Sequence, residues 1–288
     1  MGLENFIPAI WSAKLDARLR KNLAFADLVN TDYQGEITSF GDRVKINEIG
    51  TISVGDYVKN SEITFQELDG AQKELIIDQA RYFAFKIDDI DTAQQNPKVM
   101  NAAMSEASYA IADGIDQFIA KLYSSAGIKN DTYLGNATTA ISVTSGNIIS
   151  TISYASRFMD ENNVPSGNRF IVVPPWVHQK LLLAEVGGIS ATAVPKVFDD
   201  GALTAGYVGD ALGFRIILSN NVQNAATNVS AIMAFNRTAI SYAGQISKVE
   251  ATKIEKGFGE GVKGLYVFGA KVVHPESLAT LYLTEAAG

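Results

Sequence analysis

The stretch NPKVMNAAMSEASYAIADGIDQFIAKLYSSAG, residues 96–127, predicts a long helix that would form a structural spine. Asn96 is a good N-cap, and Pro97 suits the first helical position, where its missing N–H costs nothing. Gly127 is a typical residue just past a helix end. At 1.5 Å per residue the helix would be about 45 Å long. Its apolar stripe consists of Met100, Ala103, Met104, Ala107, Ile111, Gly114, Ile115, Phe118, Ile119 and Leu122.

The residues before this helix alternate between polar and apolar side chains, which is typical of half-buried strands. The alternation covers 43–47, 51–54 and 83–88, and the polar, turn-rich segment 55–62 lies between them. A two-stranded ribbon of this kind cannot bury two faces by itself and is only marginally stable in water. We therefore expect this excursion to be buried against another subunit.

The N-terminal residues 9–29 predict an amphipathic basic helix. Apolar residues recur at near-helical spacing, while Lys14, Arg18 and Lys21 share a neighbouring face at positions i, i+4 and i+7. Two interpretations remain open. The basic face is either simply solvated, or it is directed toward nucleic acid or a partner chain.

After residue 127 the pattern predicts a mixed α/β unit. A helix is expected from a Ser145 N-cap to Asn163, followed by a β-branched strand at 169–173 and a helix opened by Pro174 and Pro175. Residues 187–206 carry no periodicity and predict a long loop. Further strands are expected at 214–218, 231–235, 249–255, 265–273 and 278–283.

Composition excludes several classes of function. The chain has 288 residues, 24 basic and 31 acidic side chains and a formal charge of −7, which argues against a dedicated binder of nucleic acid or anionic membranes. It has no cysteine and two histidines, so disulfides, thiolate catalysis and zinc fingers are excluded. We find no targeting segment and no apolar run of about 20 residues that could span a membrane.

No motif indicates catalysis, a cofactor or a metal. Gly259–Gly264 spells G-x-G-x-x-G, but a strand follows it where a dinucleotide site requires a helix. Asp88, Asp89 and Asp91 lack the further oxygen ligands of a calcium loop. His178 and His274 have no accompanying nucleophile motif, so both are expected to be structural or at the surface.

The order of these elements resembles that of the major capsid proteins of tailed bacteriophages that share the HK97 fold. The resemblance extends over nearly the whole chain, and it depends on the order and spacing of several stretches together. These stretches are IWSAKL at 10–15, GDRVKI at 41–46, VGDALGF at 208–214, SNNV at 219–222 and GLYVFGAKVV at 264–273.

The resemblance implies an α+β, HK97-type capsid fold in four parts. These are an N-terminal arm (1–32), an extended β-hairpin loop or E-loop (33–92), a peripheral domain with the spine helix (93–143 and 246–288) and a central α/β axial domain (144–245). Hexamers and pentamers of the chain would close into an icosahedral shell around double-stranded DNA.

The same resemblance implies which residues make contacts. The arm would lie at the inner surface, so Lys14, Arg18 and Lys21 are candidates to face the DNA. The E-loop would lie across a neighbouring subunit, and its candidate contact residues are Gly55, Asp56, Tyr57, Lys59 and Glu62.

The implied partners are further copies of the chain, a portal protein and packaged DNA held by non-specific contact, with no membrane and no cofactor. Because only residues 1–32 precede the E-loop, we also expect a separate scaffolding protein. The protein would occupy the host cytoplasm before assembly and the virion afterwards. Two alternatives remain: an encapsulin-type nanocompartment shell, and a soluble α/β enzyme or binding domain.

Overall fold

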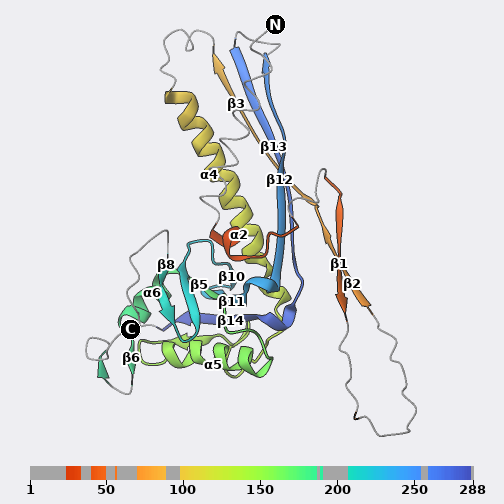
Figure 1. Ribbon diagram of the computed structural model, residues 1–288. Coiled ribbons are helices and arrows are strands. Elements are labelled where there is room, and N and C mark those ends of the chain that lie inside the picture. Colours follow the sequence, from red (N-terminus) through yellow and green to blue (C-terminus); the bar gives the residue numbers. More distant parts are fainter. Residues whose placement is uncertain are drawn as a thin grey trace, which may run out of the picture.

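The computed structural model describes residues 24–33, 40–49, 56, 70–88, 98–186, 189–190, 207–253 and 259–286. Figure 1 shows an elongated part, in which a long helix lies beside long strands, above a broader α/β part. A two-stranded ribbon lies to the side of the long strands.

The elongated part is built from one helix and three antiparallel strands. Helix α4 (Lys98–Ala120) packs on a sheet of order β12-β13-β3, made of β12 (Ile240–Lys253), β13 (Gly259–Val272) and β3 (Gln79–Asp88). Met104, Ile111, Ile115 and Ile119 of the apolar stripe are buried in this contact. Phe118 meets Phe268 edge to face, with ring centroids 5.4 Å apart. With 23 residues, α4 is about 35 Å long.

The predicted spine helix is confirmed, but it ends earlier than expected. A 3-10 turn, η3 (Lys121–Ser125), follows Ala120 directly. Gly127 has a different role from a helix cap, because a Cβ there would lie 2.5 Å from the backbone oxygen of Pro275. Its own N–H donates to that oxygen at 2.8 Å. Asn96 and Pro97 lie outside the described residues.

The broader part is a seven-stranded sheet of order β4-β14-β11-β5-β9-β8, with β10 (Asn224–Ala226) paired to β11. Strand β14 is parallel to β4 and β5 is parallel to β9, whereas the other pairs are antiparallel. The bounds are β4 (Ile141–Val143), β5 (Arg169–Val173), β8 (Tyr207–Ala211), β9 (Phe214–Leu218), β11 (Val229–Asn236) and β14 (Leu278–Glu285). A separate small hairpin joins β6 (Glu185–Val186) to β7 (Ile189–Ser190).

Both faces of this sheet are buried: every residue of β5 and β11 is buried, and both strands are largely apolar. Ile171 and Ile232 on one face pack in the cluster that includes α5 (Ile148–Glu161) and α6 (Pro175–Leu182). Phe170 and Phe235 on the other face pack in the cluster that includes α4. The sheet therefore joins the two parts of the molecule through a shared core.

A short helix, α2 (Ala24–Leu28), attaches the start of the described chain to α4. The backbone N–H of Phe25 donates to Oδ1 of the buried Asp116 at 3.2 Å. Asn30 then bridges to the start of β12, where its N–H donates to Ile240 and its carbonyl accepts from Tyr242. The chain is thus bonded to both the helix and the sheet within six residues.

Two strands have a partner outside the part of the chain to which the resemblance assigned them. Strand β14, assigned to the peripheral part, lies between β4 and β11 in the seven-stranded sheet. Strand β3, assigned to the E-loop, pairs with β13. Apolar alternation indicates a strand but not its partner, so the sequence does not predict either pairing.

The helix expected from Ser145 begins instead at Ile148, with Asn147 as its N-cap. The Asn147 side chain is turned back to the preceding strand, where it accepts from the Thr144 N–H at 2.8 Å and donates to the Ser142 carbonyl at 2.8 Å. The strand 169–173 and the helix opened by Pro174 and Pro175 are confirmed. Of the predicted loop 187–206, only residues 189–190 are described.

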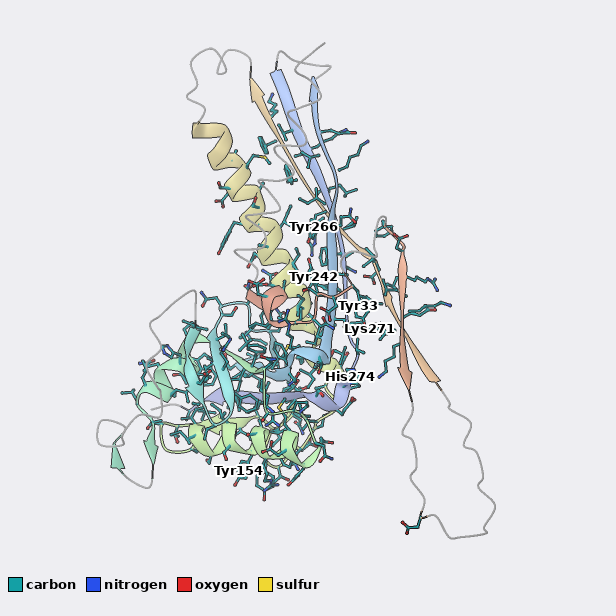
Figure 2. All side chains as sticks on the ribbon, in the orientation of Figure 1. Tyr33, Tyr154, Tyr242, Tyr266, Lys271 and His274 are labelled. Atoms are coloured by element: carbon teal, nitrogen blue, oxygen red, sulfur yellow. The ribbon has the colours of Figure 1, made fainter. Side chains whose placement is uncertain are left out.

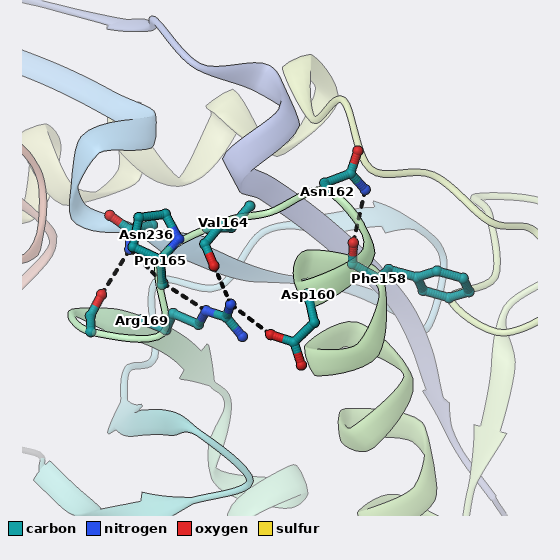
Figure 3. A network of polar contacts seen from close by, with 8 residues as sticks. Phe158, Asp160, Asn162, Val164, Pro165, Arg169 and Asn236 are labelled. Carbon is teal, nitrogen blue, oxygen red and sulfur yellow. Dashed lines mark hydrogen bonds and ion pairs between the residues drawn. The ribbon is translucent and has the colours of Figure 1, made fainter.

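The turn between α5 and β5 is held by a buried guanidinium (Figure 3). Arg169, whose side chain is 3% exposed, pairs with Oδ1 of Asp160 at 2.7 Å. It also donates to the carbonyl oxygens of Val164 and Pro165. Asn236 donates from β11 to the Pro165 and Gly167 carbonyls. These bonds satisfy backbone groups of a turn that forms no regular structure.

We expect Arg169→Met to lower the free energy of unfolding by about 2–4 kcal/mol, because it leaves buried carbonyl oxygens without a donor. Chemical denaturation of the unassembled chain measures this. Arg157→Met is the matched control, since Arg157 is half exposed in an i,i+4 pair with Glu161 and should cost no more than about 1 kcal/mol. Equal losses in both variants would contradict the role assigned to Arg169.

Candidate assembly surfaces

The feature that projects from the body is a two-stranded ribbon made of β1 (Arg43–Ile49) and β2 (Gly70–Ile76). The strands are antiparallel, with Arg43 opposite Ile76 and Ile49 opposite Gly70. The ion pair between Arg43 and Glu74, at 3.2 Å, joins them across the exposed side. We call this ribbon, together with the intervening residues 50–69, the E-ribbon.

The root of the E-ribbon is packed on the lower part of the β12-β13-β3 sheet. A small cluster forms there on the face opposite α4, and Leu75 and Ile77 are fully buried in it. Ile76, between these two residues, points to the other side of the strand and is 40% exposed. The ribbon is therefore anchored at its base by one face, and its other face is uncovered there. The cluster consists of Val44, Leu75, Ile77, Ala243 and Val267.

Two lysines, one from each strand, stabilise this root. Lys73 of β2 donates from Nζ to the carbonyl oxygen of Val273, at 2.6 Å. Lys271 of β13, labelled in Figure 2, donates from Nζ to the carbonyl oxygen of Glu74, at 2.9 Å. Hydrogen bonds from a charged donor are stronger than neutral ones. Together they hold the backbone of β2 beside the end of β13.

A glycine allows β2 to approach β13 closely. A Cβ added at Gly269 would lie 2.2 Å from the backbone oxygen of Ile76, a distance at which one of the two strands must move. Because the obstructing atom belongs to the backbone, rotation of a side chain cannot relieve the clash. The observed packing of the E-ribbon against β13 therefore requires glycine at position 269.

We expect Gly269→Ala to destabilise the subunit by about 1–3 kcal/mol through this overpacking. Amide hydrogen exchange should rise in β1 and β2 more than in α5. Gly146→Ala is the control, because the nearest atom to its added Cβ is 3.9 Å away. Unchanged exchange of β2 in Gly269→Ala would show that the close approach does not hold the ribbon.

Above the root, the same face of the sheet is uncovered in the described part of the chain. Tyr82 and Leu265 are register partners there, and they are 79% and 37% exposed. Lys248 and Lys263 flank them and both pair with Glu250, the second at 2.9 Å. These two ammonium groups hold the pKa of the Glu250 carboxyl below its ordinary value. We call this surface the open face.

The structure places few of the contact residues expected from the sequence. Asp56 is exposed, and Gly55, Tyr57, Lys59 and Glu62 lie outside the described residues. Lys14, Arg18 and Lys21 also lie outside them, so their role stays a prediction. The sequence does not predict the roles of Lys73, Lys271, Gly269 and Tyr82, since these depend on contacts between segments distant in the chain.

The described residues contain no cluster of acidic or histidine side chains that could hold a metal ion. Asp88 ends β3, while Asp89 and Asp91 are not described. His274 contacts Glu276 at 3.0 Å on the exposed turn after β13, and His178 is half-buried on α6.

The glycine-rich motif forms part of β13, paired on both sides by β12 and β3. At Gly264 an added Cβ would lie 2.2 Å from the ring of Phe83, so this glycine makes room for an aromatic side chain. The motif is therefore part of a sheet and does not open a helix, in agreement with the sequence argument against a dinucleotide site.

A polar hollow of about 700 Å³ lies near the carboxyl ends of β5, β9 and β14. Trp176, Asn220, Asn224 and Ser230 contribute to its lining. Its titratable lining residue is Glu285, which lies 3.7 Å from the Lys180 ammonium. One paired carboxylate among neutral amides and hydroxyls does not make an acid–base pair.

A family model described as phage capsid protein matches residues 71–281. The matched region, 211 of 288 residues, includes α4, both sheets and strand β2. The chain belongs to the phage capsid protein family. The resemblance seen in the sequence is thereby confirmed, as is the α+β fold class. This capsid protein is a structural, shell-forming protein of the virion.

Solved structures agree with this assignment. A chain from Mycobacterium phage Che8 is 28% identical, with 90% of each chain covered and a TM-score of 0.69. A chain in the capsid structure of Cyanophage P-SCSP1u has 20% identity, covers 92% of this chain and 89% of its own, and has a TM-score of 0.67. No curated protein matches the chain.

The fold also occurs in a virus-like particle from Pyrococcus furiosus. That chain is 13% identical, with 96% of this chain and 99% of that chain covered and a TM-score of 0.57. At this identity the likeness concerns the fold alone. Among the described helices of the capsid protein, none is long and apolar enough to cross a membrane.

Proposed function

We propose that the capsid protein forms hexamers and pentamers that close into an icosahedral shell enclosing phage double-stranded DNA, with no catalytic step. The observation that carries the proposal is the E-ribbon of a phage capsid family chain, which has a buried root, an uncovered face at Ile76 and an exposed Asp56 beyond the root. Such a ribbon gains its stability from burial against something outside the subunit.

A neighbouring subunit supplies a suitable surface in its open face. The E-ribbon residues 50–69 carry four acidic side chains and one lysine, a net charge of −3. On the open face, strand alternation places Lys86, Lys248 and Lys263 in the same rows as Glu250 and Asp88, an excess of one positive charge. Opposite charges favour the encounter of two such surfaces and penalise wrong pairings. Tyr82 and Leu265 would provide the apolar centre of the contact.

The proposal extends to the remaining partners and to the domain roles. A separate scaffolding protein, a portal protein and packaged DNA complete the assembly. The subunit would occupy the host cytoplasm before it enters the virion. The seven-stranded sheet with α5 and α6 would surround the capsomer axis, and α4 with β3, β12 and β13 would form the periphery. The net charge of −7 is consistent with a container from which DNA must leave, because tight phosphate binding is not required.

A second candidate is an encapsulin-type shell around protein cargo. It is favoured by the similarity in fold to the virus-like particle from Pyrococcus furiosus. The two candidates share the shell and differ in its contents. Purified particles from the natural source that contain double-stranded DNA support the phage capsid, and particles filled with a cargo protein support the nanocompartment.

Electron microscopy and sedimentation of the chain, expressed alone and with its presumed scaffold, test the proposal directly. Shells, tubes or hexameric rings are expected. A discrete monomer or dimer under both conditions would overturn it and favour the third reading, a soluble α/β enzyme or binding domain.

Deletion of residues 55–62 should leave a folded subunit that assembles poorly, because the segment lies beyond the anchored root of the E-ribbon. Circular dichroism checks folding, and sedimentation measures the yield of particles. Normal shells from the shortened chain would contradict the placement of this segment between subunits.

Tyr82→Glu should reduce the yield of particles about tenfold or more, since it puts a carboxylate in the apolar centre of the proposed contact. The melting temperature of the unassembled subunit should change little, because Tyr82 is 79% exposed. Tyr82→Phe, which keeps the ring, should assemble normally. If Tyr82→Glu assembles as well as the wild type, the open face is not part of the contact between subunits.

A further inference from the structure

The outer side of α4 presents an uncovered helix face within the described structure. Glu106, Tyr109, Ala110, Asp113 and Gln117 are spaced so that they share one side of the helix. Tyr109 is 60% exposed, and Gln117 donates to Oδ2 of Asp113 at 2.7 Å. We call these five residues the outer face of α4. It carries two negative charges around an exposed aromatic ring.

Small residues on the outer face leave room for a second helix to pack closely. Ala110 is exposed and small, and Gly114 next to it is so open that an added Cβ would have no atom within 4 Å. Packed helices lie about 8–10 Å apart, the distance depending on the side chains at the contact. Small residues here permit a close approach, while Tyr109 provides apolar area.

The start of the described chain is attached to α4 next to the outer face. The bond from the Phe25 N–H to Asp116 fixes residue 25 against α4, one turn below Asp113 and two turns below Tyr109. Phe25 is 1% exposed and Asp116 is 4% exposed, so the attachment is buried. The chain is therefore attached to α4 at the level of Asp116, one turn from Asp113 of the outer face.

The segment that precedes this attachment has the complementary pattern. Residues 9–23 contain four basic side chains and one acidic side chain, a net charge of +3. Trp11, Leu15, Leu19 and Leu23 follow one another at intervals of four and form an apolar stripe beside the basic face. An amphipathic helix of this kind needs an apolar surface to cover its stripe.

The spacing of the charges agrees with the attachment point. Phe25 and Asp116 are 91 positions apart. If a helix runs parallel to α4 with the same rise, this offset places Lys14 level with residue 105 and Lys21 level with residue 112. Glu106 and Asp113 are each one residue from these levels. Seven residues separate the two cations, and seven separate the two carboxylates.

We propose that residues 9–23 dock as a helix on the outer face of α4 of the same chain, with the leucine stripe over Tyr109 and Ala110. Lys14 and Lys21 then pair with Glu106 and Asp113. Two of the three cations of the basic face are then neutralised by the subunit's own carboxylates, so Lys14 and Lys21 do not contribute to DNA binding. The proposal does not depend on what the shell contains.

Crosslinking tests the seat, because the chain has no native cysteine. We would combine Leu19→Cys with Ala110→Cys in the full chain and apply a short thiol-reactive crosslinker. The control combines Leu19→Cys with Tyr82→Cys, an exposed position on the open face. Within-chain crosslinking should be about tenfold faster for the Ala110 pair, since docking raises the local concentration of the two thiols.

Two outcomes of this experiment would overturn the proposal. Equal rates for the Ala110 and Tyr82 pairs would mean that the arm has no preferred seat. Crosslinks that join two chains, visible as a dimer on a denaturing gel, would assign the outer face to the arm of another subunit. Because the readout is the mass of a denatured chain, it does not depend on whether shells form.

The charges are tested separately by hydrogen exchange of residues 9–23. Glu106→Lys with Asp113→Lys should accelerate exchange about fivefold, the effect of losing two exposed ion pairs. Adding Lys14→Glu and Lys21→Glu to that variant should restore the original rate. Failure of the reversed charges to restore protection would show that these pairs do not form.

Discussion

The pairing of β12 with β13 is the constraint on which the rest of the structure depends. The two strands are in register from Ile240 opposite Val272 to Lys253 opposite Glu260, with one irregularity near Ile246. Helix α4 covers one face of this pair, the root of the E-ribbon covers part of the other, and β3 extends it sideways. The segment that follows α2 is hydrogen-bonded to β12 through the backbone of Asn30.

Small residues along this pair decide what can approach it. Gly244 leaves room for the hydroxyl of Tyr242, which shares a buried 2.8 Å hydrogen bond with Tyr266. Gly264 makes room for the Phe83 ring, and Gly269 for the backbone of β2. Each glycine has a different neighbour, so a Cβ at any of the three would disturb a different contact. The close contacts of β12 and β13 at these positions thus depend on the absence of a side chain.

The charged surfaces of the subunit divide into regions suited to contact with other protein segments. The open face is basic, residues 50–69 are acidic, the outer face of α4 is acidic and residues 9–23 are basic. Such a pattern favours specific pairing over general attraction to phosphate, which would require a basic surface. It agrees with an acidic chain that forms a shell through contacts between protein segments.

The amino-acid sequence determined the elements whose signal is local. The spine helix, the apolar strands β5 and β11 and the Pro-opened helix α6 follow from periodicity, β-branching and proline chemistry within a few residues. The order of these elements also sufficed to indicate the capsid fold.

The tertiary structure alone decided that β14 lies inside the seven-stranded sheet and that β3 pairs with β13. It also decided that Lys73, Lys271 and Gly269 hold the E-ribbon against β13. These features are contacts between segments as much as 200 residues apart, and no local pattern of side chains specifies which partner a strand or a lysine will meet.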